Sequence, residues 1–146
     1  IEPYVKEFTT GDAKGFVYTY GNRFISHFKI DQIEEAISRL KNNPTSRRAT
    51  CVTYDPTTDF DNNDIPCLIM LDFKVRDNQL NVTGVWRSHD ICQAYYPNLI
   101  GVSYLSYKVA SHIGVTLGKI TTHSISAHIR DDDTDYAKEL IKQWYY

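Results

Sequence analysis

A thiol, a guanidinium and an amide follow one another in the middle of this chain. Cys67, in the segment Ile65-Pro66-Cys67, precedes Arg87 by twenty residues, and Asn98 follows eleven residues later. A thiolate can add to an electron-poor ring, a guanidinium can hold a phosphate, and an amide can read the edge of a pyrimidine. The combination predicts chemistry on a pyrimidine nucleotide.

Cys67 is the candidate nucleophile because it follows a proline at the start of an expected strand. Arg87 on the next strand is the expected source of the positive charge that a thiolate needs. A cysteine among apolar neighbours is more often an inert core residue, and this alternative stays open for Cys67. Cys51 lies within a strand pattern and is expected in the core, whereas Cys92 is ambiguous. The odd number of cysteines without a CxxC pair favours a reducing compartment, and we expect a cytoplasmic protein.

Two further arginines, Arg47 and Arg48, follow a turn and begin an expected strand. Paired arginines offer bidentate donors to a phosphate, although a solvated turn is the more common explanation of such a pair taken alone. Ser88 adds a hydroxyl donor beside Arg87. The sequence leaves open whether the three arginines converge on one phosphate.

Asn98 and His128 are the remaining candidate substrate contacts. Asn98 lies at an expected helix start, where N-capping is the alternative to reading a base. Its amide offers both a donor and an acceptor, which would favour uracil over cytosine. His128 shares one side of an expected strand with Ser124 and Ser126. The other four histidines lack metal-ligand spacing, so no metal site is expected.

The composition predicts one globular domain. The 146 residues are 42% hydrophobic and carry a formal net charge of −2. This length supports a real core, and the charge argues against a broad nucleic-acid or membrane surface. No apolar run reaches the ~20 residues of a membrane span. The chain begins at Ile1 and its only methionine is Met70, so we expect an N-terminally truncated or processed product.

Hydrophobic periodicity places these groups on an α+β fold. Alternation predicts strands over residues 16–24, 48–54, 67–76, 80–87 and 119–129. Helical spacing and stop signals predict helices over residues 31–42, 98–113 and 133–144, the first with its start at Asp31 and the second with its end at Gly114. Asp77-Asn78 should form the turn between two strands, and residues 55–64 should form a polar loop. Ile69, Leu71 and Phe73 should share the apolar face of their strand, whereas the polar side of residues 119–129 should line a wet cleft. We expect one mixed or predominantly antiparallel sheet with packed helices.

Six segments, in order between about Phe16 and Arg130, resemble motifs of the thymidylate synthase family. They are Tyr20-Gly21-Asn22-Arg23-Phe24, Asn43-Pro44-Thr45-Ser46-Arg47-Arg48, Pro66-Cys67-Leu68, Trp86-Arg87-Ser88-His89-Asp90, Asn98 and His128-Ile129-Arg130. Their shared order and separations carry the resemblance. It implies a three-layer, thymidylate synthase-like fold, similar to the shorter archaeal branch of the family.

The resemblance implies methylation of dUMP to dTMP. Cys67 would add to the ring, and the neighbouring carbon would take a one-carbon unit and a hydride from methylene-tetrahydrofolate or a related methylene-tetrahydropterin. Tyr20 would order a water for proton removal, and Asp90 would face the pterin.

The resemblance also assigns the substrate contacts. Arg87 and Ser88 would hold the phosphate, Asn98 the uracil edge, and His128 the sugar hydroxyl. Arg47 and Arg48 would reach the phosphate in a partner subunit, which implies a homodimer with shared active sites. No nucleic-acid or membrane partner is expected.

Three residues depart from the family motifs. Leu68 stands where the family has histidine, Trp86 where it has glutamine, and Arg130 where it has tyrosine. The family's catalytic glutamate would lie upstream of Ile1. Two alternatives therefore stay open: a pyrimidine deoxynucleotide hydroxymethylase, which ends the reaction with water in place of hydride, and a nucleotide-binding fragment without catalysis.

Overall fold

The computed structural model describes residues 2–13 and 15–145. The helices are α1 (Glu2–Thr9), α2 (Tyr20–Ile25), α3 (Gln32–Asn42), α4 (Pro56–Asp59), α5 (Tyr95–Ile113) and α6 (Thr134–Tyr145), with a 3-10 turn over Asp131–Asp133. The strands are β1 (Thr50–Val52), β2 (Leu68–Arg76), β3 (Gln79–Trp86), β4 (His89–Asp90), β5 (Thr116–Ser124) and β6 (Ala127–His128). No helix among the described residues is long and apolar enough to cross a membrane.

The main sheet has the order β1-β2-β3-β5 and is mixed. β1, β2 and β3 pair antiparallel, whereas β5 runs parallel to β3 after the long crossover through α5. The α+β class and the mixed sheet are therefore confirmed.

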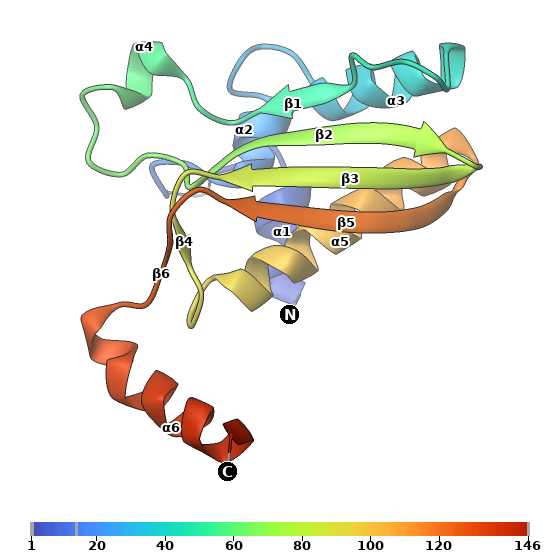
Figure 1. Cartoon of the computed structure of the whole chain (residues 1–146). Coiled ribbons are helices and arrows are strands. Elements are labelled where there is room, and N and C mark those ends of the chain that lie inside the picture. Colours follow the sequence, from blue (N-terminus) through green and yellow to red (C-terminus); the bar gives the residue numbers. More distant parts are fainter. Residues whose placement is uncertain (1, 14, 146) are drawn as a thin grey trace.

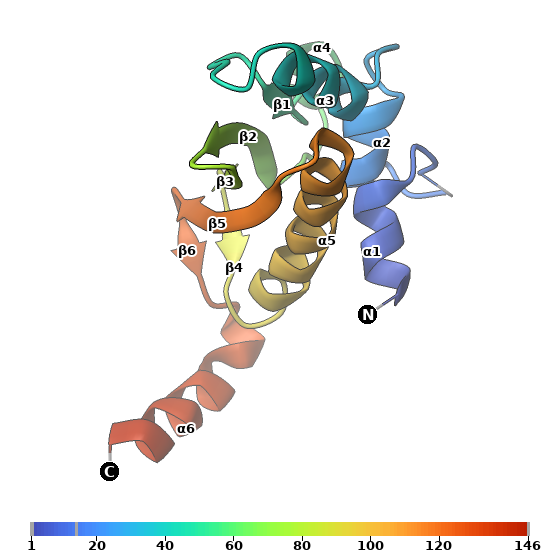
Figure 2. The same ribbon diagram turned by 90° about the vertical axis from the view of Figure 1, so that its right-hand side faces the viewer.

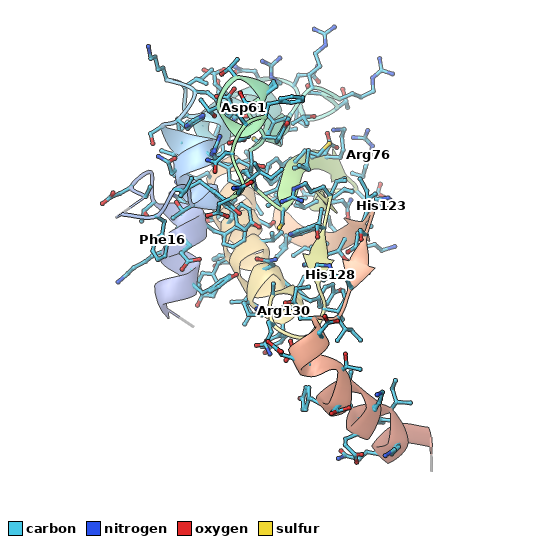
Figure 3. The ribbon with its side chains drawn as sticks, turned by 90° about the vertical axis from the view of Figure 1, so that its left-hand side faces the viewer. Phe16, Asp61, Arg76, His123, His128 and Arg130 are labelled. Carbon is cyan, nitrogen blue, oxygen red and sulfur yellow. The ribbon has the colours of Figure 1, made fainter. Side chains whose placement is uncertain are left out.

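α3 and α5 cover one face of this sheet, and α1 lies on the outer side of α5 (Figure 2). Arg76 and His123 lie on the opposite side, away from α5 (Figure 3). The described part of the chain carries no helix on that side, so one chain supplies two of the three expected layers.

Local signals set the β2–β3 hairpin and the end of α5 as expected. Asp77 and Asn78 adopt φ values of 51° and 58°, which a two-residue hairpin turn requires and which Asn and Asp tolerate. Gly114 ends α5 with a φ of 77°. A register shift between Leu68 and Met70 corrects one detail, because it buries Leu68 and turns Ile69 away from the core face.

The strand expected over residues 16–24 is wrong, because this segment contains α2. The Thr19 side chain caps α2 by accepting a hydrogen bond from the Asn22 amide at 3.0 Å. A Cβ at Gly21 would lie 2.3 Å from the Thr10 carbonyl oxygen, so only glycine permits this close approach to the end of α1. Tertiary packing thus outweighs the alternating pattern.

The loop expected over residues 55–64 contains α4, and a buried ion pair anchors it. Arg23 of α2 bonds Asp59 of α4 at 2.5 Å, and their side chains are 3% and 0% exposed. The other oxygen of the Asp59 carboxylate accepts from the Asp55 amide at 2.8 Å. The segment that leads to Cys67 is therefore fixed to the helical layer, because separating a buried pair leaves an uncompensated charge.

The continuous strand expected over residues 119–129 is also corrected. β5 ends at Ser124, a bend follows, and β6 pairs in parallel with β4. Consequently Ser126 and His128 are exposed and do not continue the face of β5. Beyond β6, α6 extends away from the body of the molecule (Figure 1).

Gly101 generates a test of the helical layer. A Cβ there would lie 2.2 Å from the ring of Phe8, which is fully buried. Gly101→Ala should lower the free energy of unfolding by about 1–3 kcal/mol in urea titrations, because overpacking outweighs the better helix propensity of alanine. In a Phe8→Ala background the same substitution should cost much less. Equal costs in both backgrounds would contradict this contact.

Candidate active site

Arg87 and the turn before β2 form the centre of the site. The Arg87 side chain donates from Nε to the Pro66 carbonyl and from Nη2 to the Ile65 carbonyl, both at 2.9 Å. Its backbone amide donates to the Cys67 carbonyl at 2.8 Å. Nη2 also lies 3.8 Å from the Cys67 Sγ. The structure thus brings the candidate nucleophile and the candidate phosphate ligand together, with Cys67 half-buried.

Two tyrosines hold the same turn from the side of α2. The Tyr20 hydroxyl accepts from the Leu68 amide at 3.3 Å, and the Tyr18 hydroxyl donates to the Ile65 carbonyl at 3.4 Å. Burial raises the pKa of Tyr20 well above its ordinary value and that of Tyr18 to about 12. Both phenols therefore keep their protons. Sequence reasoning selected Tyr20 but missed Tyr18, two residues earlier.

Asn98 does not cap a helix, so the capping alternative is wrong. α5 begins three residues earlier, with Ala94 at its N-cap, and Asn98 is only 2% exposed. Its Oδ1 accepts from the Tyr4 hydroxyl at 3.1 Å, and its Nδ2 lies 3.3 Å from the His89 Nε2. Sequence reasoning missed Tyr4 and His89, although His89 lies inside the Trp86–Asp90 motif.

Pairing of β4 with β6 brings Ser88 beside His128. The Ser88 Oγ lies 3.4 Å from the His128 Nδ1, and both side chains are open to solvent. Figure 3 shows His128 on this strand pair, with Arg130 just below it where the C-terminal segment leaves the body. The Asp90 Oδ1 accepts from the amides of Cys92 and Gln93, both at 3.0 Å. Asp90 therefore orders the approach to α5, and its contact with a pterin stays a prediction.

Arg47 and Arg48 lie apart from this cluster. The Ala49 carbonyl accepts from the Phe73 amide, which places the arginines about 20 Å along β2 from Cys67. Together with Arg39 of α3 they line a polar hollow of about 620 Å³. The three arginines considered for one phosphate therefore do not converge within a single chain. Among the described residues, no three histidine, cysteine or carboxylate side chains form a metal-binding group.

The family model named thymidylate synthase matches residues 5–146. The chain belongs to the thymidylate synthase family. It is 54% identical to a protein of Methanothermobacter thermautotrophicus over 97% of this chain and 64% of that protein. It is 47% identical to a protein of Methanococcoides burtonii over 97% of this chain and 66% of that protein.

A more distant relative comes from Methanocaldococcus jannaschii, at 34% identity over 98% of this chain and 69% of that protein. All three proteins carry the name "Putative thymidylate synthase". The chain thus spans about two thirds of the length of these relatives.

Two of the three departures from the thymidylate synthase motifs are core residues in this family member. Leu68 and Trp86 are both fully buried. The Trp86 ring stacks on the His89 imidazole, with centroids 4.6 Å apart and an interplanar angle of 5°. Arg130 instead is exposed and precedes the 3-10 turn. The buried Trp86 therefore packs against His89 of the same motif, whereas Arg130 faces solvent.

The electrostatic balance at Cys67 differs from the expectation. Burial raises the pKa of the Cys67 thiol, the Arg87 guanidinium opposes this shift, and the Asp64 carboxylate adds to it. The net direction is upward, so one neighbouring arginine does not outweigh burial. The free site therefore holds a protonated thiol at neutral pH.

This balance predicts how fast Cys67 reacts. In a Cys92→Ser background, alkylation by iodoacetamide should be slow at neutral pH and should accelerate as the pH rises past 9, because only the thiolate reacts. Asp64→Asn should shift this profile to lower pH by removing a nearby negative charge. Asp77→Asn, at the far end of β2, is the matched control and should leave it unchanged. Half-maximal reactivity below the ordinary thiol value of 9.0 would contradict the balance.

Proposed function

We propose that this protein converts dUMP to dTMP, taking the one-carbon unit and the hydride from methylene-tetrahydrofolate or a related methylene-tetrahydropterin. The carrying observation is the Cys67 Sγ at 3.8 Å from the Arg87 guanidinium. A thiol beside a cation suits a substrate with an electron-poor ring at one end and a phosphate at the other. Family membership supports the same reaction.

In this reaction Cys67 adds to C6 of the uracil ring, and C5 becomes the nucleophile. C5 takes the methylene carbon and loses its proton, and hydride from the tetrahydropterin completes the methyl group. The pterin leaves as its dihydro form, and the Cys67 sulfur is released. Tyr20 orders the water that takes up this proton. Its hydroxyl accepts from the amide of Leu68, the residue after Cys67, and this position near the cysteine supports the role.

Arg87 and Ser88 hold the phosphate, and Asp90 faces the pterin. Two nitrogens of Arg87 are occupied by the Ile65 and Pro66 carbonyls. Within the part of the chain that the structure describes, no protein acceptor is found for Nη1, which leaves donors for a phosphate oxygen. His128 contacts the sugar hydroxyl, a role that its 3.4 Å separation from Ser88 supports.

The working unit is a cytoplasmic homodimer with shared sites. Arg47 and Arg48 lie too far from Cys67 of their own chain to reach the same phosphate. The sheet face without helices offers a surface on which a second copy can pack. Each subunit then lends its arginine pair to the phosphate bound by its partner.

Covalent trapping tests the reaction. Fluorodeoxyuridylate with a methylene-tetrahydropterin should add one nucleotide and one pterin to the full-length protein in intact-mass spectra, because fluorine at C5 blocks proton loss. Cys67→Ser should abolish the adduct and Cys92→Ser should retain it. An adduct that persists in Cys67→Ser, or its absence from the unsubstituted protein, would contradict the proposal.

Product analysis distinguishes the alternatives. A methylated nucleotide supports thymidylate synthesis, whereas a hydroxymethyl product assigns the hydroxymethylase reaction. Nucleotide binding without turnover assigns a non-catalytic module.

Subunit mixing tests the shared site. Cys67→Ser alone and the double variant Arg47→Ala/Arg48→Ala should each trap little nucleotide. Mixed after dissociation and reassociation, they should form adduct, because one site of each heterodimer then combines an intact cysteine with intact arginines. Each variant mixed with itself is the control, and equal trapping in all mixtures would contradict shared sites.

A further inference from the structure

Four buried or half-buried side chains from four elements form a hydrogen-bonded row behind the cysteine. Tyr4 of α1 donates to the Asn98 Oδ1 at 3.1 Å. The Asn98 Nδ2 lies 3.3 Å from the His89 Nε2, and the His89 Nδ1 lies 2.9 Å from the Ser124 Oγ. Asn98 and His89 are each 2% exposed. None of the proposed chemical steps uses His89, although it is a titratable group beside the residue assigned to the base.

When the Tyr4 phenol donates, the donor and the acceptor of every other hydrogen bond in the row are fixed. Burial raises the pKa of Tyr4 to about 12, so its proton stays in place and needs an acceptor, which is the Asn98 Oδ1. The Asn98 Nδ2 can only donate, so the His89 Nε2 must accept. The imidazole proton then resides on Nδ1, where it donates to the Ser124 Oγ.

The surroundings of His89 hold it as this neutral tautomer. Its ring stacks on Trp86 and lies 5.1 Å from the Tyr95 ring. Burial lowers the pKa of the imidazole; the Asp90 carboxylate opposes this shift and His128 adds to it. A neutral ring retains the lone pair on Nε2 that the amide needs.

The direction of the Asn98 amide decides which pyrimidine it matches. Uracil presents an N3–H donor and an O4 acceptor, whereas cytosine presents an N3 acceptor and an N4 amino donor. An amide that places Oδ1 toward N3 and Nδ2 toward the ring's position 4 therefore matches uracil, and the flipped amide matches cytosine. Beyond the bonds to Tyr4 and His89, the Asn98 Oδ1 can accept one more hydrogen bond and the Nδ2 can donate one more, which is what a pyrimidine edge requires.

We propose that His89 is a specificity-determining positioning residue, which fixes the Asn98 amide in the direction that matches uracil and opposes cytosine. This inference rests on the proposed function, because that function supplies the pyrimidine nucleotide. Leaving a buried polar group wrongly paired is costly, so a fixed amide discriminates more strongly than a freely rotating one.

Paired substitutions of His89 test the inference in the full-length protein. Calorimetry would measure the dissociation constants of dUMP and dCMP. His89→Asn places an amide near the former Nδ1 but cannot reach Asn98, and it should reduce the preference for dUMP over dCMP about tenfold. His89→Gln extends a polar atom to the former Nε2 position and should restore most of the preference. If His89 had only a structural role, its substitution would change the dissociation constants of dUMP and dCMP by the same factor, and this result would contradict the inference.

Ser124→Ala provides a second variant if His89→Asn does not fold. It removes the acceptor for the Nδ1 proton, releases the tautomer, and should lower the preference several-fold. An unchanged preference in every folded variant, beside tight dUMP binding by the unsubstituted protein, overturns this inference alone. If the unsubstituted protein binds neither nucleotide, the proposed function fails, and the inference fails with it because Asn98 then has no pyrimidine to read.

Discussion

The site depends on one guanidinium that is held by backbone carbonyls. Arg87 directly follows β3, and its two bonds to the Ile65 and Pro66 carbonyls tie this end of β3 to the turn before β2. These bonds occupy two N–H donors and fix the direction of the guanidinium, so it lies beside the Cys67 sulfur. Among the described residues, no carboxylate forms an ion pair with it. This geometry is the one that the proposed phosphate contact requires.

In the free site the Cys67 thiol is held in position but is not ionised at neutral pH. Burial of Cys67 opposes the charge of Arg87, and the thiol keeps its proton. The buried Arg23–Asp59 pair, Tyr18 and Tyr20 hold the turn in place, so the position of the sulfur is fixed in the free protein. A protonated thiol also limits unwanted reaction with oxidants or electrophiles when no substrate is present.

Local patterns predicted those parts of the fold that local interactions determine. The Asp77-Asn78 turn, the Asp31 cap of α3 and Gly114 each satisfy a backbone requirement within a few residues. The errors arose where distant contacts decide. Residues 16–24 alternate like a strand, yet the packing of Gly21 against the end of α1 favours the helix that a local bond to Thr19 caps. The same holds for the bend that separates Ser124 from His128.

The candidate site was predictable to a similar degree. Motif order selected Cys67, Arg87 and Asn98 as candidates, but the Tyr4–Asn98 bond joins residues 94 positions apart, which no periodicity reveals. From the sequence His89 was considered only as a metal ligand, and only the fold places its Nε2 3.3 Å from the Asn98 Nδ2. Residue types alone left open whether Arg47 and Arg48 join Arg87, and the structure shows that they lie far from it within one chain.

A crystal structure of the full-length protein with dUMP would test the central interaction most directly. The expected density places the phosphate on Arg87 and Ser88, with C6 of the ring facing the Cys67 sulfur and Arg87 still bonded to the Ile65 and Pro66 carbonyls. A nucleotide bound away from Cys67, or a phosphate without contact to Arg87, would contradict it.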